Sequence, residues 1–246
     1  MAYTRLSPAD KQALLRTIVD RCEPTGGGAP VVVFDLDGTL IDNRPRTCAI
    51  LHELGEHWRS TRPAVAETLL QARPHELAYL MRDSLVRLGI VEAELSAEAE
   101  AFWKRRFFAD DYIRHDVALE GAVSYAHACY ERGAVVAYFT GRDLPAMSVG
   151  SWKSLRDLGF PIGLPGTELV VKPRFDMPDE TFKRSFAPRL GRLGKIVAVF
   201  DNEPANCNLL LDHFPSSTSV FVDTQHLPGA PPLDRRVHVV SDFDMR

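Results

Sequence analysis

The chain has 246 residues, of which 45% are hydrophobic and 25% are charged, so it can bury a sizeable core in one large domain or in a domain with an insertion. The formal net charge of −4 and the isoelectric point near 6.1 disfavour a polynucleotide substrate and an anionic membrane surface as partners. No apolar run approaches membrane-spanning length, and the polar N-terminus lacks the apolar core of a signal peptide. We therefore expect a cytoplasmic protein that binds neither nucleic acid nor membrane.

The N-terminal stretch predicts a helix. Ser7 and Pro8 form a typical helix start, and apolar residues then recur at helical spacing up to Cys22. The glycine run 26–28 is expected to be a connector, because no Gly-Lys-Ser/Thr follows it. The four cysteines are scattered with no Cys-x-x-Cys spacing, which favours reduced, buried thiols over disulfides or zinc ligands.

Residues 31–34, VVVF, predict a strand that is buried on both faces of a parallel sheet. Asp35 and Asp37 follow at once, and alternation along an extended chain places both on one side. Two ionised carboxylates about 4 Å apart repel by about 4 kcal/mol at an effective dielectric near 20. A bound cation, or a proton held on one of the pair, would compensate for this repulsion. Gly38 allows the chain to turn sharply after the strand.

The stretch 43–115 gives several helical patterns and no strand pattern, and none returns until about Ala134. A crossover between parallel strands needs only about a dozen residues, so about seventy residues indicate a domain-sized helical insertion. Five of its basic residues are candidates for selecting the substrate, although we expect them to be ordinary solvated side chains: Arg44, Arg46, His52, Arg73 and His75.

From residue 119 onward, helices and strands alternate. A helix is predicted at 121–132, and strands at 134–139, 168–171, 196–200, 219–222 and 237–240. This alternation predicts an α/β fold with a doubly wound parallel sheet. Ligands of such sheets bind beyond the carboxyl ends of the strands, which places Asp35, Asp37, Thr140 and Asp201 at one edge.

Two of these segments resemble motifs of the haloacid dehalogenase superfamily: DLDGTL at 35–40 is similar to the first motif, and YFTGR at 138–142 to the second. The resemblance implies a Rossmann-like core at 1–42 and 116–246, with a helical cap at 43–115 that covers the site. It also implies a Mg²⁺-dependent phosphatase that acts on a small phosphorylated metabolite. Asp35 would attack phosphorus to form an aspartyl-phosphate, and Asp37 would serve as acid and base.

The same resemblance carries Thr140 over as a phosphate binder, with backbone N–H groups near Gly141. It assigns Mg²⁺ ligation to Asp35, to the carbonyl of Asp37 and to Asp201. Arg142 could contact a substrate phosphate or form a structural ion pair.

Two lysines compete for the role of phosphate-binding cation. Lys172 follows a predicted strand, whereas Lys183 lies near the start of a probable helix. Lys183 is favoured because certain acid-phosphatase members of the superfamily have a Phe-Lys or Tyr-Lys at a helix start. The lysine that is not used would be a solvated surface residue or a second contact to the substrate.

The segment after Asp201 departs from the superfamily's commoner fourth motif. Phe200 stands in place of a glycine, and Asn206 stands where a second acid would be, so Glu203 is a candidate outer-shell partner. Helix capping near residue 204 could account for Asn202 but not for Asp201.

Three other functions fit parts of the pattern. A dehalogenase would need no acid at position 37, so Asp37 argues against it. A phosphomutase would use the same residues and exclude water, and a catalytically silent binding protein would lack the nucleophile that Asp35 provides.

Overall fold

The computed structural model describes residues 3–246 and contains a parallel sheet of six strands in the order β5-β4-β1-β6-β7-β8. The strands are β1 (Pro30–Phe34), β4 (Val135–Asp143), β5 (Thr167–Lys172), β6 (Lys195–Asp201), β7 (Thr218–Val222) and β8 (His238–Val240). This confirms the predicted doubly wound fold. Every residue of β1 is buried, as expected for a central strand that is covered on both faces.

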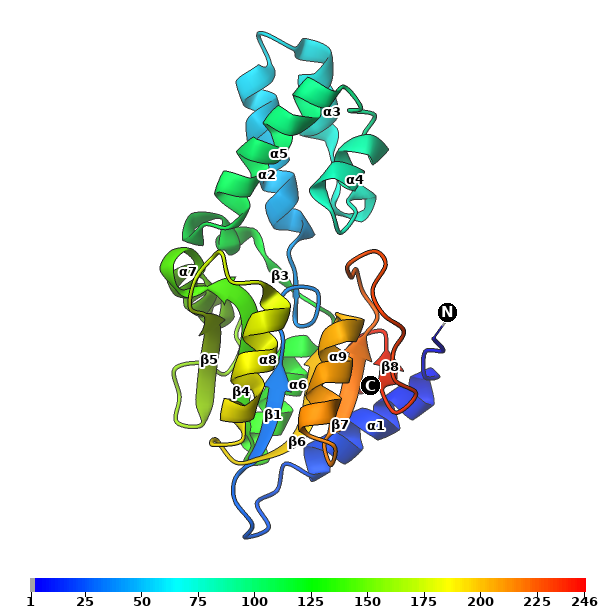
Figure 1. Ribbon diagram of the computed structural model, residues 1–246, viewed down its shortest axis with the longest axis vertical. Coiled ribbons are helices and arrows are strands. Elements are labelled where there is room, and N and C mark those ends of the chain that lie inside the picture. The colour runs from blue at the N-terminus through cyan, green and yellow to red at the C-terminus, as the bar shows by residue number, and fades with distance from the viewer. Residues whose placement is uncertain (1–2) are drawn as a thin grey trace.

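Helices cover both faces of the sheet (Figure 1). Alternation along β1 directs Phe34 into the core formed with α1 (Pro8–Asp20), α6 (Ala122–Glu131) and part of α7 (Leu144–Asp157). It directs Val33 into the core formed with α8 (Asp179–Leu190) and α9 (Pro204–His213). The helix start at Ser7 is also as predicted, since its side chain accepts a hydrogen bond from the backbone N–H of Asp10.

The four cysteines are all free and buried, which agrees with the sequence prediction. Within residues 3–246, no helix combines the length and the apolar character needed to cross a bilayer.

The segment from residue 43 to residue 116, between β1 and α6, forms a separate group of helices beyond one end of the sheet (Figure 1). They are α2 (Arg44–Trp58), α3 (Pro63–Gln71), η1 (Pro74–Glu76), α4 (Met81–Arg87), α5 (Ala93–Phe107) and η2 (Asp110–His115). They enclose a hydrophobic cluster of their own that includes Leu51, Leu85 and Phe102. We call this group the helical insertion.

A short two-stranded ribbon joins the helical insertion to the sheet. Its strands, β2 (Ile41–Asp42) and β3 (Val117–Ala118), pair antiparallel, so the two connections run side by side. The expectation of no strand between residue 43 and about residue 134 was therefore wrong at β3. Strands of two residues are too short to show an alternating pattern, so the sequence contained no signal for them.

Candidate active site

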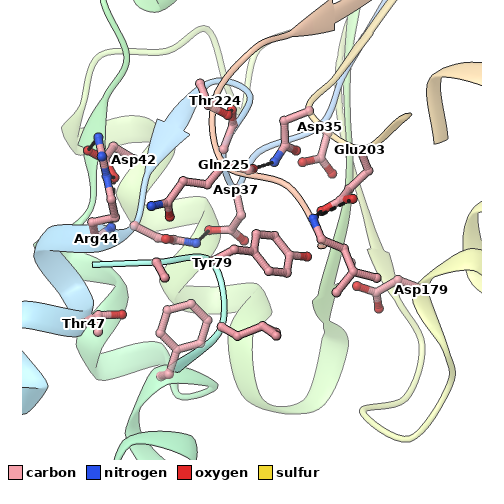
Figure 2. A pocket seen from close by; sticks show the side chains of 18 of the residues that line it. Asp35, Asp37, Asp42, Arg44, Thr47, Tyr79, Asp179, Glu203, Thr224 and Gln225 are labelled. Carbon is pink, nitrogen blue, oxygen red and sulfur yellow. Dashed lines mark hydrogen bonds and ion pairs between the residues drawn. The ribbon is translucent and has the colours of Figure 1, made fainter. Parts of the chain in front are cut away.

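Three neighbouring strands deliver acidic and hydroxyl side chains to one edge of the sheet. Asp35 follows β1, Thr140 lies in the last part of β4, and Asp201 ends β6. α8 adds Lys183 to this group from one face of the sheet. Asp35, Thr140 and Lys183 line a cavity of about 1180 Å³ between the sheet and the helical insertion (Figure 2). The structure thus brings together the residues that the sequence placed at this edge.

Lys183 is shared by two buried carboxylates. Its Nζ lies 2.6 Å from Oδ1 of Asp35 and 2.6 Å from Oδ2 of Asp201. Its side chain is only 2% exposed, so burial would lower its pKa, but the two carboxylates together hold that pKa above its usual value. Two carboxylates against one ammonium leave this cluster with a charge of −1 when all three are ionised.

The uncompensated charge changes the proton affinity of Asp35. Burial raises the pKa of this carboxyl to about 8, although Lys183 opposes the rise, and the neighbouring Asp201 adds to it. Asp37 has a smaller effect on Asp35 than either of these two residues. The two acids of the motif are therefore in separate environments.

Asp37 is held by arginines. Arg142 binds it in bidentate fashion, through Nε to Oδ2 at 2.8 Å and Nη2 to Oδ1 at 2.7 Å. Arg46 from α2 and Asn43 each donate to the same Oδ1 at 3.1 Å. Burial would raise the pKa of Asp37, but Arg142, and then Arg46 and Asn43, hold it well below its usual range. The negative charge of Asp37 is therefore compensated by two arginines, and not by the metal ion or the proton that the pair of acids in the sequence suggested.

Both arginines also bind a second carboxylate, that of Asp116, which lies just before β3. Asp116 accepts from Nε and Nη2 of Arg46 at 2.7 and 2.6 Å, and from Nη2 of Arg142 at 2.7 Å. The side chains of Arg46 and Asp116 are fully buried. The expectation that Arg46 is a solvated side chain was therefore wrong. Its partners are distant in sequence, so nothing in the local pattern revealed them.

Thr140 and Gly141 form the surface on which a phosphoryl group could rest. The Thr140 hydroxyl is buried and accepts from the backbone N–H of Arg142 at 3.2 Å, which leaves its proton available to a ligand. A side chain would not fit at Gly141, because the start of α8 is close and a Cβ would lie 2.5 Å from Oδ2 of Asp179.

Lys172 is not brought to Asp35. At the end of β5 its Nζ lies 2.7 Å from Oδ1 of Asp179, whose side chain is 61% exposed. The expectation of a solvated lysine was wrong, because the Lys172 side chain itself is only 10% exposed. Arg142, the other side chain for which the sequence left two possibilities, forms an ion pair with Asp37 and Asp116. The contacts thus separate the two lysines, with Lys183 at the acids and Lys172 at the edge of the sheet.

The segment after Asp201 supports the acid cluster through Asn206. The carboxylate oxygen of Asp201 that Lys183 does not contact, Oδ1, accepts from the backbone N–H of Glu203 at 2.9 Å and from Nδ2 of Asn206 at 3.1 Å. Asn202 does not cap α9 as the alternative supposed. Its side chain accepts from Thr39 and donates to the carbonyl of Gln225. It is Asp201, by contrast, that accepts the backbone N–H at the helix start.

Gly38 is required at the turn after β1. Its φ of +79° favours glycine, and an added Cβ would lie 2.3 Å from Nδ2 of Asn202. The carbonyl of Gly38 also accepts from the hydroxyl of Thr224 at 2.5 Å. The first motif is therefore packed against the segments that follow β6 and β7.

The donor set suits a hard divalent cation. Within residues 3–246, no group of three His, Cys, Asp or Glu side chains is arranged to hold a metal ion. The ligand set predicted from the sequence needs only two side chains, Asp35 and Asp201, with the carbonyl of Asp37. Oδ2 of Asp35 has only a long contact, 3.5 Å from the hydroxyl of Thr39. A buried cluster with a charge of −1 and an accessible carboxylate oxygen fits Mg²⁺, which prefers oxygen ligands.

Sequence reasoning missed a contact between the helical insertion and the sheet. Tyr79, in the loop before α4, lines the same cavity as Glu203 (Figure 2). Nearby, Nε2 of Gln225 donates to the carbonyl of Leu77 at 2.5 Å, which links the helical insertion to the segment after β7. The carboxylate of Glu203 accepts the backbone N–H of Leu227, at 3.1 Å to Oε1 and 3.2 Å to Oε2, so it is bound to this same segment and not to Asp201's side chain. No periodicity marks the residues of a loop, so no signal in the sequence identified this contact.

The parallel sheet, with acids at the ends of β1 and β6 and helices inserted after β1, is an α/β, Rossmann-like fold of the kind that the resemblance implies. The sequence matches no protein-family model and no curated protein sequence. The family resemblance of the short motifs is thus accompanied by a fold that agrees with it.

Solved structures share this fold. A protein of Clostridium difficile described as a candidate phosphatase is 14% identical over 85% of this chain and 93% of its own, with a TM-score of 0.55. A predicted phosphoglycolate phosphatase of Haemophilus somnus is 14% identical over 87% and 94%, with a TM-score of 0.53. Protein Tyrosine Kinase A of Mycobacterium tuberculosis is 15% identical over 87% and 94%, with a TM-score of 0.55.

Proposed function

We propose that this protein is a Mg²⁺-dependent phosphomonoester hydrolase that acts through an aspartyl-phosphate on Asp35. The observation that carries the proposal is the sharing of Lys183 between Asp35 and Asp201, next to Thr140 in the cavity. Two of the solved structures with this fold are described as phosphatases, which supports the assignment. The substrate would be a small phosphorylated metabolite bound between the sheet and the helical insertion.

In the first step, a carboxylate oxygen of Asp35 attacks phosphorus, and the bond from phosphorus to the ester oxygen breaks. The Thr140 hydroxyl and the backbone N–H groups around Gly141 hold phosphoryl oxygens, while the Lys183 ammonium offsets their negative charge. The departing oxygen takes a proton from Asp37. Asp35 attacks in its ionised form, which the nearby ammonium of Lys183 favours.

In the second step, water gives a proton to Asp37 and attacks the phosphorus of the aspartyl-phosphate, which releases inorganic phosphate and regenerates Asp35. The arginine contacts of Asp37 suit this second role, because they stabilise the ionised, proton-accepting carboxylate. To carry a proton in the first step, Asp37 must loosen these contacts. Arg46 belongs to the helical insertion, so a movement of the insertion would alter the contacts directly.

Asp35, Asp201 and the carbonyl of Asp37 would hold the Mg²⁺ ion. When bound, the ion supplies positive charge that offsets the cluster of acids and the charge that develops on the phosphoryl oxygens.

A screen of phosphate monoesters tests the proposal. Wild-type protein with Mg²⁺ should release inorganic phosphate from at least one ester, EDTA should abolish the release, and Asp35→Asn should be inactive. Asp212→Asn, which changes an exposed acid on α9, serves as the matched control and should retain activity. Near-wild-type rates in Asp35→Asn would refute the covalent mechanism. Transfer of the phosphoryl group without release of phosphate would identify a phosphotransferase instead.

A further inference from the structure

The cavity above the acids is large for the ester of a two- or three-carbon alcohol. Its volume of about 1180 Å³ exceeds the range of roughly 300 to 1,000 Å³ that is typical of small-molecule sites. Its acidic end accounts for the phosphoryl group, whereas the side towards the helical insertion combines a group of large apolar side chains with charged ones, namely Arg44, Arg82, Glu100 and Lys104. The large apolar side chains on that side would therefore contact the alcohol part of the substrate, which is the leaving group of the first step.

Three aromatic rings of α5 and the residue after it form one part of this lining: Trp103, Phe107 and Phe108. Ring centroids lie 4.5 Å apart between Trp103 and Phe107, and 5.1 Å apart between Phe107 and Phe108. The indole N–H of Trp103 donates to Oγ1 of Thr47 at 3.1 Å, which fixes the orientation of that ring. We call these three residues the aromatic wall.

The loop before α4 contributes Tyr79 and Leu80 to the cavity lining, and the first residue of α4 contributes Met81. Tyr79 and Leu80 are 43% and 40% exposed although both are large. The hydrogen bond from Gln225 to the carbonyl of Leu77 holds this loop against the segment after β7. Large side chains that are kept exposed around a cavity are typical of a ligand site.

Packing within the helical insertion explains only part of this surface. Trp103 and Phe107 also contact the hydrophobic cluster of the insertion, so each has a structural role. Phe108, Tyr79 and Leu80 are not part of that cluster. Phe108 instead packs edge-on against two rings, those of Phe107 and of Phe175 in the loop before α8. These residues thus extend the apolar lining beyond what the core of the insertion needs.

From this arrangement we infer that the alcohol part of the substrate carries a planar aromatic ring, which packs against the aromatic wall. The inference rests on the proposed phosphatase activity and specifies its substrate class. Rings favour offset or edge-to-face contact with other rings, a geometry that a saturated group of the same size cannot reproduce. Esters of short hydrophilic alcohols would leave the wall uncovered.

Three esters of primary alcohols provide the test, because their leaving groups are matched: phenylethyl phosphate, cyclohexylethyl phosphate and ethyl phosphate. We expect kcat/KM for phenylethyl phosphate to exceed that for ethyl phosphate by at least about tenfold and that for cyclohexylethyl phosphate by about threefold. The first ratio measures binding of the larger group, and the second measures the preference for a planar ring.

Substitutions then locate the effect. Phe108→Leu removes a ring but keeps an apolar side chain, and it should lower the ratio of phenylethyl to cyclohexylethyl turnover by about twofold to threefold. Trp152→Leu is the matched control, since Trp152 is a partly exposed aromatic residue on α7 that does not line the cavity. It should leave both ratios unchanged.

Each remaining outcome contradicts either the inference or the function on which it rests. Equal turnover of phenylethyl and cyclohexylethyl phosphate would overturn the aromatic preference, and faster turnover of ethyl phosphate would overturn the inference altogether, while both would leave the phosphatase activity intact. If no ester is hydrolysed, the proposed function fails. Calorimetry with phenylpropylphosphonate and cyclohexylpropylphosphonate then decides separately whether the cavity prefers a planar ring, and equal affinities would overturn that preference.

Discussion

Asp35 and Asp37 are two residues apart in one motif, yet they have opposite electrostatic environments. Asp35 shares a single lysine with Asp201, so its cluster has an excess of negative charge. Asp37 shares two arginines with Asp116, so its cluster is balanced. The under-compensated acid is the one that can gain from a cation or from an electrophilic phosphorus. The balanced acid is held in place by four donor contacts, which suits a group that must accept a proton at a fixed position.

The largest expected effect concerns the lysine at the under-compensated acid. Lys183→Met should lower kcat/KM by at least about a hundredfold, because it removes the one side-chain cation that binds Asp35 and Asp201 among residues 3–246. Lys172→Met, which changes a lysine paired with the exposed Asp179, should lower it by less than about threefold. Steady-state phosphate release measures both variants. The reverse order would show that Lys172 is the phosphate-binding residue.

A second prediction tests the balance of the other cluster. Asp116→Asn would leave Arg46 and Arg142 with Asp37 as their only carboxylate, and an uncompensated buried charge is expensive. We expect the free energy of unfolding to fall by about 3 kcal/mol in urea titrations. Asp179→Asn removes an ion pair whose carboxylate is 61% exposed, and it should cost at most about 1 kcal/mol. Similar losses for the two variants would mean that the arginine cluster is less buried than described.

The two acids of the motif should also differ in how neutralisation affects stability without Mg²⁺. Where Asp35 is ionised, above its raised pKa of about 8, Asp35→Asn brings its cluster from −1 to neutral, and below that pKa it replaces an acid that is already neutral. In both ranges the free energy of unfolding should stay unchanged or rise. Asp37→Asn leaves a positive excess beside Asp116, and stability should fall by about 2 kcal/mol. Thermal unfolding in the presence of EDTA compares them. A loss in Asp35→Asn as large as that in Asp37→Asn would contradict the charge count.

Much of the fold could be predicted because buried strands are continuous apolar runs, and this signal is local. The six strands of the sheet were expected from it, although β4 continues through Thr140 to Asp143, beyond its apolar part. The carboxyl edge could be predicted as well, since parallel strands place their ends together. β2 and β3 could not, because two residues carry no periodicity.

The contacts within the site were less predictable, because burial of a long polar side chain depends on partners elsewhere in the chain. Arg46 is buried only because Asp116, seventy residues later, and Asp37 accept its N–H groups. The contact of Leu77 was missed for a similar reason, since its partner Gln225 lies in the segment after β7. A motif identifies which acids meet, but not which cations compensate each of them.

The smallest expected effect comes from an ion pair outside the site, which provides a reference for the two clusters. Burial would raise the pKa of Asp242, but hydrogen bonds from Lys11 and Ser241 hold it below its usual value. A lowered carboxyl pKa stabilises the fold above the unfolded-state pKa of about 4, and this contribution disappears as the pH falls through the folded-state pKa. The stability advantage of wild type over Asp242→Asn, at most about 1 kcal/mol near neutral pH, should therefore shrink towards pH 3. A constant difference across that range would contradict the assignment.

The most direct test of the account is to identify the residue that carries the phosphoryl group. Wild-type protein mixed with a turned-over ester and Mg²⁺, then quenched in acid within one turnover, should yield a phosphorylated peptide with the modification on Asp35 by mass spectrometry, and Asp35→Asn should yield none. A phosphoryl group on another residue, or steady turnover with an unmodified Asp35 at every quench time, would contradict the proposed mechanism.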